Sequence, residues 1–300
     1  MDLDKPKGNS FEYRVLKTPK FSGVNGDGRL HLVGITGRDN PNSQKIDIYL
    51  TNSRPSLDPT TGALLKNEEV GADMTIEHFQ TSSKSPATSF QHQKTFRDQA
   101  IRTPNNIALA PQNNGFYFTN DHGTAKAGLQ FELANLIRNG DVSYCSSEGN
   151  CKTVAKGFAF PNGLIMGMDN RLYVPSAFAG GIDVFKVLAD KEVEKVDHID
   201  IPYPIDNLSQ DAEGSIWAAG LPKISSTLAA FADPLKIVPP STVFKINRRS
   251  GGWDVQKILE DRDAEVLPGA TTAVHDAKTG RVFVSGIVSP FITVCEPKKV

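Results

Sequence analysis

The chain has 300 residues, of which 39% are hydrophobic and 22% charged, and its formal net charge is −1. This composition is that of a globular protein with a large core, and it excludes a chain that is mainly disordered. The near-neutral charge, without a basic patch, argues against a nucleic-acid partner. No stretch approaches the roughly 18 to 20 apolar residues that cross a membrane, so we expect no transmembrane segment.

The first thirty residues offer little regular pattern. Only residues 11–16 resemble a strand, and we expect 1–30 to be an incomplete N-terminal segment of one propeller domain that spans 1–300. Residues 1–20 lack the apolar core of a secretory signal. The localisation therefore stays open: secreted if the natural start lies further upstream, and otherwise cytoplasmic.

One pattern recurs along the rest of the chain. Each copy has a branched aliphatic residue, about five residues of strand, a turn rich in Asn, Asp or Gly, and a second strand. In chain order the copies cover 32–52, 104–120, 161–176, 205–220 and 270–286. Repeats of this length that each form a small sheet are typical of propeller blades. We therefore predict an all-β fold, a β-propeller.

The segments between these hairpins complete the blades. Residues 140–147, 180–188 and 241–249 read as third strands, and 128–140 as a short helix that stops at Asn139-Gly140. The polar, Ser-rich stretch 78–95 reads as a loop away from any site.

The three cysteines leave the redox state open. Cys145 and Cys151 enclose a short polar segment that a surface hairpin could close with a disulfide, and Cys295 is left alone. Three reduced thiols are the alternative.

Polar side chains recur just before the branched aliphatic residue of the repeat. Three copies carry Asn105, Asn162 and the pair Asp206-Asn207 at this place, whereas the first and last copies have Val33-Gly34 and Thr272-Ala273. The same place in each blade faces the central channel, so these side chains should converge there. Carboxylate and amide oxygens are calcium ligands, although each residue alone is an ordinary turn former.

Longer motifs resemble the serum paraoxonase/arylesterase family, which are six-bladed, calcium-dependent lactonases. The similarity rests on NNIALAP, GFYFTNDHG, AKGFAFPNGL, YPIDNLSQDAEGSIWAAG, TTAVHDAKTGRVFVSG and ITVCE. It implies a six-bladed propeller whose first blade is missing or incomplete, a calcium cofactor held by Asn105, Asn162, Asp206 and Asn207, and a lactone or aryl ester as the small-molecule substrate.

The chain departs from the family pattern in its N-terminal part. The family's first blade, with an acidic pair and a cysteine, has no counterpart here, and a second calcium would meet Asn106 where the family has an aspartate. The positions of the family's histidine dyad hold Val33 and residues 52–54.

His122 and Asp121 are the residues available as a catalytic base in this chain. The other histidines lie in strands or polar loops and are given no role. Three alternatives to this function remain open: a non-catalytic propeller scaffold, a gluconolactonase/regucalcin-like lactone hydrolase and, disfavoured by the Asn/Asp alignment, a strictosidine-synthase-like protein that needs no metal.

Overall fold

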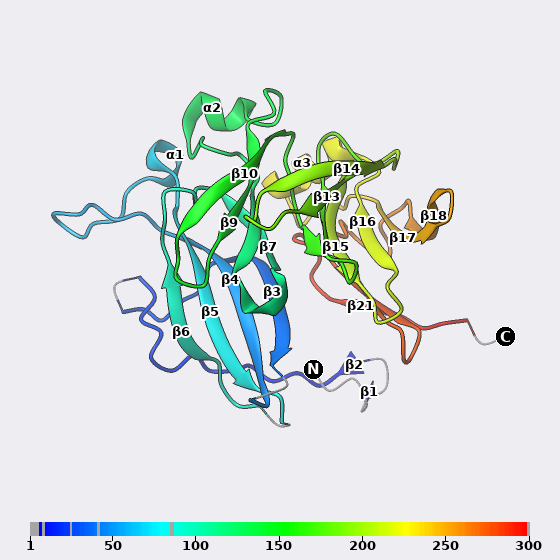
Figure 1. Cartoon of the computed structure of the whole chain (residues 1–300), viewed down its shortest axis with the longest axis horizontal. Helices are drawn as coiled ribbons and strands as arrows, with labels where there is room; N and C mark the ends of the chain where they lie inside the picture. Colours follow the sequence, from blue (N-terminus) through cyan, green and yellow to red (C-terminus); the bar gives the residue numbers. More distant parts are fainter. Residues whose placement is uncertain (1–5, 8–9, 25, 41–42, 85–86, 299–300) are drawn as a thin grey trace.

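Five small antiparallel sheets follow one another along the chain. The computed structural model describes residues 6–7, 10–24, 26–40, 43–84 and 87–298, and its sheets are arranged radially (Figure 1). The first blade comprises β3 (Leu32–Asn40), β4 (Lys45–Arg54), β5 (Asp73–Ser82) and β6 (Gln91–Phe96), and the second comprises β7 (Pro104–Leu109), β8 (Phe116–Asn120), β9 (Gly140–Cys145) and β10 (Cys151–Phe158). The third blade comprises β11 (Ile165–Met166), β12 (Arg171–Pro175), β13 (Ile182–Val187) and β14 (Val193–Ile199), and the fourth comprises β15 (Ile205–Gln210), β16 (Ile216–Gly220), β17 (Ser241–Arg249) and β18 (Gly252–Asp261). The fifth blade comprises β19 (Thr272–Asp276), β20 (Arg281–Ser285) and β21 (Thr293–Cys295).

The predicted all-β propeller is confirmed, with five blades rather than six in the part of the chain that the structure describes. All five predicted hairpins are the first two strands of a blade, and the predicted third strands are β9, β13 and β17. Two local predictions were wrong. The stretch 78–95 lies mostly in β5 and β6, and the predicted helix α2 (Gly128–Leu133) ends well before Asn139.

The hydrophobic core is divided among the interfaces between neighbouring blades. One buried cluster joins the first blade to the second, through Ile76, Phe96, Ile107 and Phe118, and three further clusters join the second to the third, the third to the fourth and the fourth to the fifth. Burying one such side chain contributes about 1.5–3 kcal/mol. Stacking the blades therefore supplies the main stabilisation of the fold.

The described residues form no fifth cluster of this kind that would close the ring. None of the four clusters of described residues joins β3 to β19. Instead the N-terminal segment crosses between these blades: Phe11 contacts Phe283 of the fifth blade, and Phe21 contacts Phe79 of the first, with ring centroids 6.5 and 5.4 Å apart. A pair of very short strands, β1 (Pro6–Lys7) and β2 (Ser10–Phe11), begins this segment.

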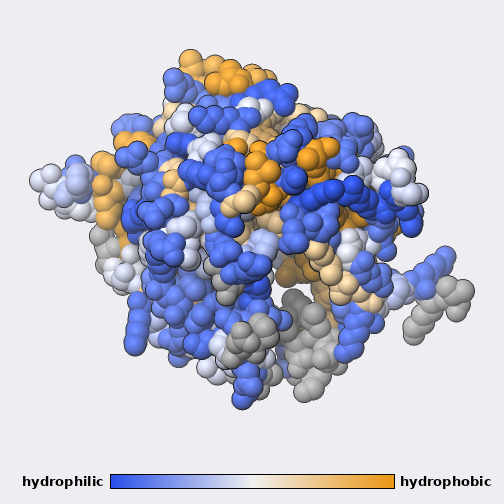
Figure 2. All heavy atoms as spheres, viewed as in Figure 1, coloured by the Kyte–Doolittle hydropathy of each residue, from blue (hydrophilic) through white to orange (hydrophobic). Residues whose placement is uncertain are grey.

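Three short helices lie at one end of the propeller (Figure 1): α1 (Asn67–Val70), α2 and α3 (Ile224–Ala232). Apolar surface gathers at this end (Figure 2), and Leu129 of α2 and Phe231 of α3 are exposed. No helix in the described ranges is both long and apolar enough to cross a membrane. Cys145 and Cys151 form a disulfide across the β9–β10 hairpin, and Cys295 is free.

Candidate active site in the central channel

The innermost strand of a blade carries a β-bulge at the position that the repeat singled out. In β7 the pairing with β8 passes from Pro104–Asn120 to Ile107–Phe118, so that β7 has one residue more than its partner over this stretch. A bulge leaves residues unpaired and re-aims their side chains. Here it turns Asn105 and Asn106 out of the regular ladder.

The same register shift recurs in three other blades. In the third blade it lies between the Pro161–Ser176 bridge and the Ile165–Tyr173 pair, around Asn162-Gly163. It also falls between Ile205 and Leu208 in β15, around Asp206-Asn207, and between Leu32 and Ile35 in β3, around Val33-Gly34. In β19 the register with β20 is unbroken. The alignment of Thr272-Ala273 with the other pairs was therefore wrong, because β19 lacks the bulge that makes those positions equivalent.

These residues line one pocket of about 1020 Å³ in the central channel. The four residues predicted as ligands, Asn105, Asn162, Asp206 and Asn207, all belong to its wall, and so does Asn106. The remaining wall, from β3, β7, β11, β15 and the fifth blade, mixes aliphatic residues with glycines and polar residues, among them Arg38 and Gln210. The pocket thus combines a polar region with apolar side chains, which is typical of sites for small organic ligands.

Hydrogen bonds connect the polar residues. Asn106 donates to the amide oxygen of Asn207 at 3.0 Å, and Asn207 donates to Asp206 Oδ1 at 2.7 Å and to the carbonyl of Thr271 at 2.8 Å. Asn105 instead donates to Asp121 Oδ2 at 3.1 Å. Asn106 was not among the predicted ligands, and the contact with Asn207 gives it a place in the same network.

Side chains of one blade fix the backbone of the next. Thr51 of β4 donates its hydroxyl to the carbonyl of Asn105 at 3.1 Å, and Thr119 of β8 donates to the carbonyl of Asn162 at 3.0 Å. Gly163 comes so close to Asn207 that a Cβ atom there would lie 2.1 Å from the amide oxygen of Asn207. The packing between blades therefore sets where the polar side chains stand.

Asp206 is the single carboxylate among the described residues that line the channel pocket. Burial raises the pKa of Asp206 to about 7, because removal from water penalises the charged form. Asp206 Oδ1 accepts a hydrogen bond from the neutral amide of Asn207. A cation beside Asp206 would offset this penalty and favour the ionised carboxylate.

The oxygen ligands of this wall, carboxylate and amide, are of the chemical type that hard cations bind. Among the described residues, no group of three or more His, Cys, Asp and Glu could hold a metal ion, so a zinc-type centre is not formed by them. Side-chain amide oxygens and one carboxylate are acceptable ligands for calcium, which also takes waters and carbonyls. Such a set carries little negative charge.

His122 and Asp121 lie beside the channel on the turn after β8. His122 Nδ1 is 2.8 Å from Asp121 Oδ1, and the imidazole stacks on Phe131 of α2 with centroids 3.8 Å apart and planes 8° apart. Neither residue lines the channel pocket; both line a second, smaller pocket of about 180 Å³, and Val33 belongs to the walls of both pockets. Since the other oxygen of Asp121 accepts the amide of Asn105, the acid connects the imidazole to the channel wall.

Four of the remaining histidines pair with carboxylates inside the blades. The pairs are His78–Asp47 at 2.8 Å, His92–Glu77 at 3.0 Å, His198–Asp183 at 2.6 Å and His275–Asp211 at 2.8 Å. None of these residues lines the channel pocket or the smaller pocket that contains His122 and Asp121.

Comparison with known proteins places the chain among esterases. It is 27% identical over 293 residues to serum paraoxonase/lactonase 3 of Oryctolagus cuniculus, covering 91% of this chain and 79% of the relative. It is 32% identical over 151 residues to serum paraoxonase/arylesterase 1 of Homo sapiens, covering 49% and 41%.

Solved structures with a similar fold include distant relatives. A gluconolactonase from Xanthomonas campestris has a TM-score of 0.44 and 14% identity over 85% of this chain and 84% of that one, too distant to carry an argument.

The model of the family described as Arylesterase matches residues 4–288. The chain therefore belongs to the arylesterase family, as its sequence motifs indicate.

Proposed function

We propose that the protein is a calcium-dependent hydrolase of lactones or aryl esters, with its reaction site at the polar wall of the channel. The observation that carries this proposal is the bulge shared by β7 and β15, which brings Asn105, Asn106, Asp206 and Asn207 into one pocket. The names of its relatives, a paraoxonase/lactonase and a paraoxonase/arylesterase, support the substrate class.

Calcium would be held by Asp206 and by the amide oxygens of Asn105, Asn162 and Asn207, with Asn106 beside them. When bound, it supplies positive charge that polarises an ester carbonyl and stabilises the developing oxyanion. Asp206 provides the negative charge, and the amides orient the oxygen atoms. The aliphatic wall keeps the hydrocarbon part of the substrate away from water.

The pair His122 and Asp121 would activate the attacking water. His122 takes the proton, while the hydrogen bond to Asp121 orients the ring and stabilises the imidazolium that forms. Asn105 donates a hydrogen bond to the same carboxylate and so fixes the position of this pair relative to the channel wall.

The direct test is hydrolysis of γ- and δ-lactones and of phenyl acetate by purified protein, with calcium and with excess chelator. We expect turnover that requires calcium and returns when calcium is restored. A folded sample that gains thermal stability from calcium but hydrolyses none of these compounds would support the scaffold alternative. Turnover that is unchanged in chelator would remove calcium from the mechanism.

A further inference from the structure

Asn120, the last residue of β8, has a fully buried amide whose hydrogen-bonding groups are all used. Its oxygen accepts the backbone N–H groups of Arg102 and Thr103 at 3.1 and 3.0 Å. Its nitrogen donates to the carbonyl of Ala100 at 2.9 Å and to Asp141 Oδ1 at 2.8 Å. Asn120 therefore fixes the loop that leads into β7 and to Asn105.

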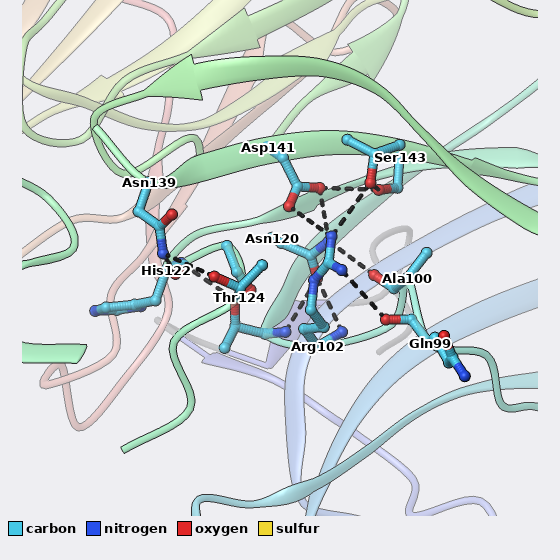
Figure 3. A network of polar contacts seen from close by, with 12 residues as sticks. Gln99, Ala100, Arg102, Asn120, His122, Thr124, Asn139, Asp141 and Ser143 are labelled. Carbon is cyan, nitrogen blue, oxygen red and sulfur yellow. Dashed lines mark hydrogen bonds and ion pairs between the residues drawn. The ribbon is translucent and has the colours of Figure 1, made fainter. Parts of the chain in front are cut away.

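Asp141 anchors this amide from the neighbouring strand β9. Besides Asn120 it accepts the hydroxyl of Ser143 at 2.8 Å and Nη2 of Arg102 at 3.2 Å. Figure 3 shows Arg102, Asn120 and Asp141 joined in this network, with His122 on the adjacent turn. A buried carboxylate with three partners is a rigid support, since losing Arg102 would leave its charge unpaired and losing Asn120 or Ser143 would remove a hydrogen bond from a buried oxygen.

The fixed loop in turn holds the backbone of the catalytic pair. The carbonyl of Thr103 accepts the N–H of Asp121 at 3.1 Å, and its hydroxyl accepts the N–H of His122 at 3.2 Å. From the other side, Asn139 donates its amide to the carbonyl of His122 at 2.9 Å (Figure 3). The positions of both residues thus depend on a loop that Asn120 keeps in place.

The first blade contains a similar buried amide, Asn52, but no such turn follows it in the chain. Asn52, at the corresponding place in β4, accepts the N–H of His31 at 2.8 Å, and its nitrogen lies 3.5 Å from Glu77 Oε1. After Asn52 the chain continues as strand to Arg54. Asn52 therefore supports the blade alone, which makes it a matched control.

We propose that Asn120, anchored by Asp141, is a positioning residue for Asp121 and His122. It acts through the loop and Thr103, and it contacts neither the substrate pocket nor the imidazole. The proposal rests on the proposed function, because it takes this pair as the base. Its geometric part, that Asn120 holds the turn, can be tested without any activity.

The kinetic test compares Asn120→Ala with Asn52→Ala. Both should lower the melting temperature, because each removes a buried amide from the same place in a blade. Only Asn120→Ala should lower kcat, by about ten- to a hundredfold with KM nearly unchanged, since a shift of about 1 Å in a catalytic group has an effect of this size. An equal loss of kcat in both variants, or an unchanged kcat in Asn120→Ala, would overturn the proposal.

A second pair of variants covers the case in which Asn120→Ala does not fold. Thr103→Val removes the hydroxyl that accepts the His122 N–H, whereas Thr103→Ser keeps it. We expect the Val variant to lose kcat as Asn120→Ala does and the Ser variant to recover it. Equal activity of the two Thr103 variants would contradict the positioning route.

The readout without activity is the NMR signal of the His122 ring protons. Because the ring stacks on Phe131, these protons should be shifted upfield in the wild-type protein. The shift should decrease in Asn120→Ala and Thr103→Val and persist in Asn52→Ala and Thr103→Ser. If the wild-type protein hydrolyses no ester, the proposed function is wrong, but the NMR signal still tests whether Asn120 holds the turn. An unchanged signal in Asn120→Ala or Thr103→Val would overturn the positioning role.

Discussion

The central channel has two unlike sides. On one side, β7, β15 and the segment before β11 present amides and a carboxylate, and on the other, β3 and β19 present aliphatic side chains such as Val33, Ile35 and Val274, which are 52%, 60% and 45% exposed. The β-bulge occurs on both sides, in β7 and in β3. The backbone geometry therefore belongs to the blade, whereas the candidate chemistry depends on which residues occupy the bulge.

The largest effect should follow from removing the charge of the polar side. We expect Asp206→Ala to lose activity about a thousandfold, because a bound metal ion contributes several kcal/mol and about 1.4 kcal/mol corresponds to a factor of ten. The increase in melting temperature on adding calcium should also disappear. Both are measured by lactone hydrolysis and thermal unfolding across a calcium titration.

Asp206→Asn separates charge from shape in the same experiment. It keeps an oxygen ligand of similar size, so we expect weak calcium binding that needs a much higher concentration. If the alanine variant gained as much thermal stability from calcium as the wild-type protein, the polar side would not be the calcium site.

The second effect is a pH dependence of the calcium-free protein. Because the pKa of Asp206 is raised from its ordinary value to about 7, the folded chain holds this proton more tightly than the unfolded chain. Its contribution to stability is therefore present at low pH and is lost as pH rises between roughly 4 and 7, by at most about 1.4 kcal/mol per pH unit. Urea unfolding in chelator should show this slope in the wild-type protein and a smaller one in Asp206→Asn. An equal dependence of the unfolding free energy on pH in both proteins would show that other groups cause it.

The third effect concerns the contact, away from the channel, that attaches the fifth blade and its strand β19 to the fourth blade. Asp211 is buried, and its Oδ2 accepts Trp217 Nε1 of β16 and contacts His275 Nδ1 of β19, both at 2.8 Å. Burial would raise the pKa of Asp211, but these hydrogen bonds hold it below the ordinary value. Asp211→Ala leaves buried donors unpaired, and we expect a loss of about 2–3 kcal/mol in the free energy of unfolding.

Calcium titration supplies the control for this variant. Asp211 does not line the channel pocket, so the calcium midpoint of Asp211→Ala should stay close to that of the wild-type protein. A variant that unfolds as the wild-type protein does would show that the contact between the fourth and fifth blades does not depend on this carboxylate.

Much of the propeller could be predicted because each hairpin is local in the sequence. The turn residues and the aromatic second strands identify β7 and β8, and the predicted third strand 241–249 coincides with β17. The stretch 78–95 was misjudged because its polar residues are strand residues with distant partners. His78 on β5 contacts Asp47 on β4 at 2.8 Å, and a pairing across 31 positions leaves no local signal.

The candidate site could be predicted only in part for a related reason. Asn105, Asn162 and Asp206 share one alignment position and Asn207 follows directly after it, so their convergence follows from the repeat. The role of Asn106 depends on the bulge, which is a shift of register between strands and is invisible in one strand alone. The contact between Asn105 and Asp121 likewise depends on how β8 lies against β7.

The smallest effect should come from a matched pair at the first bulged position, Asn105→Ala on the polar side and Val33→Ala on the aliphatic side. Removing one amide ligand should raise the calcium concentration at half saturation by about tenfold, the size of effect seen when groups around a metal are changed. Val33 is half exposed, so its truncation should change stability by less than about 0.5 kcal/mol and leave calcium binding unchanged. Calorimetric titration measures calcium binding in the two variants. If the two variants weakened calcium equally, binding would depend on the shape of the bulge and not on the oxygen that Asn105 brings to it.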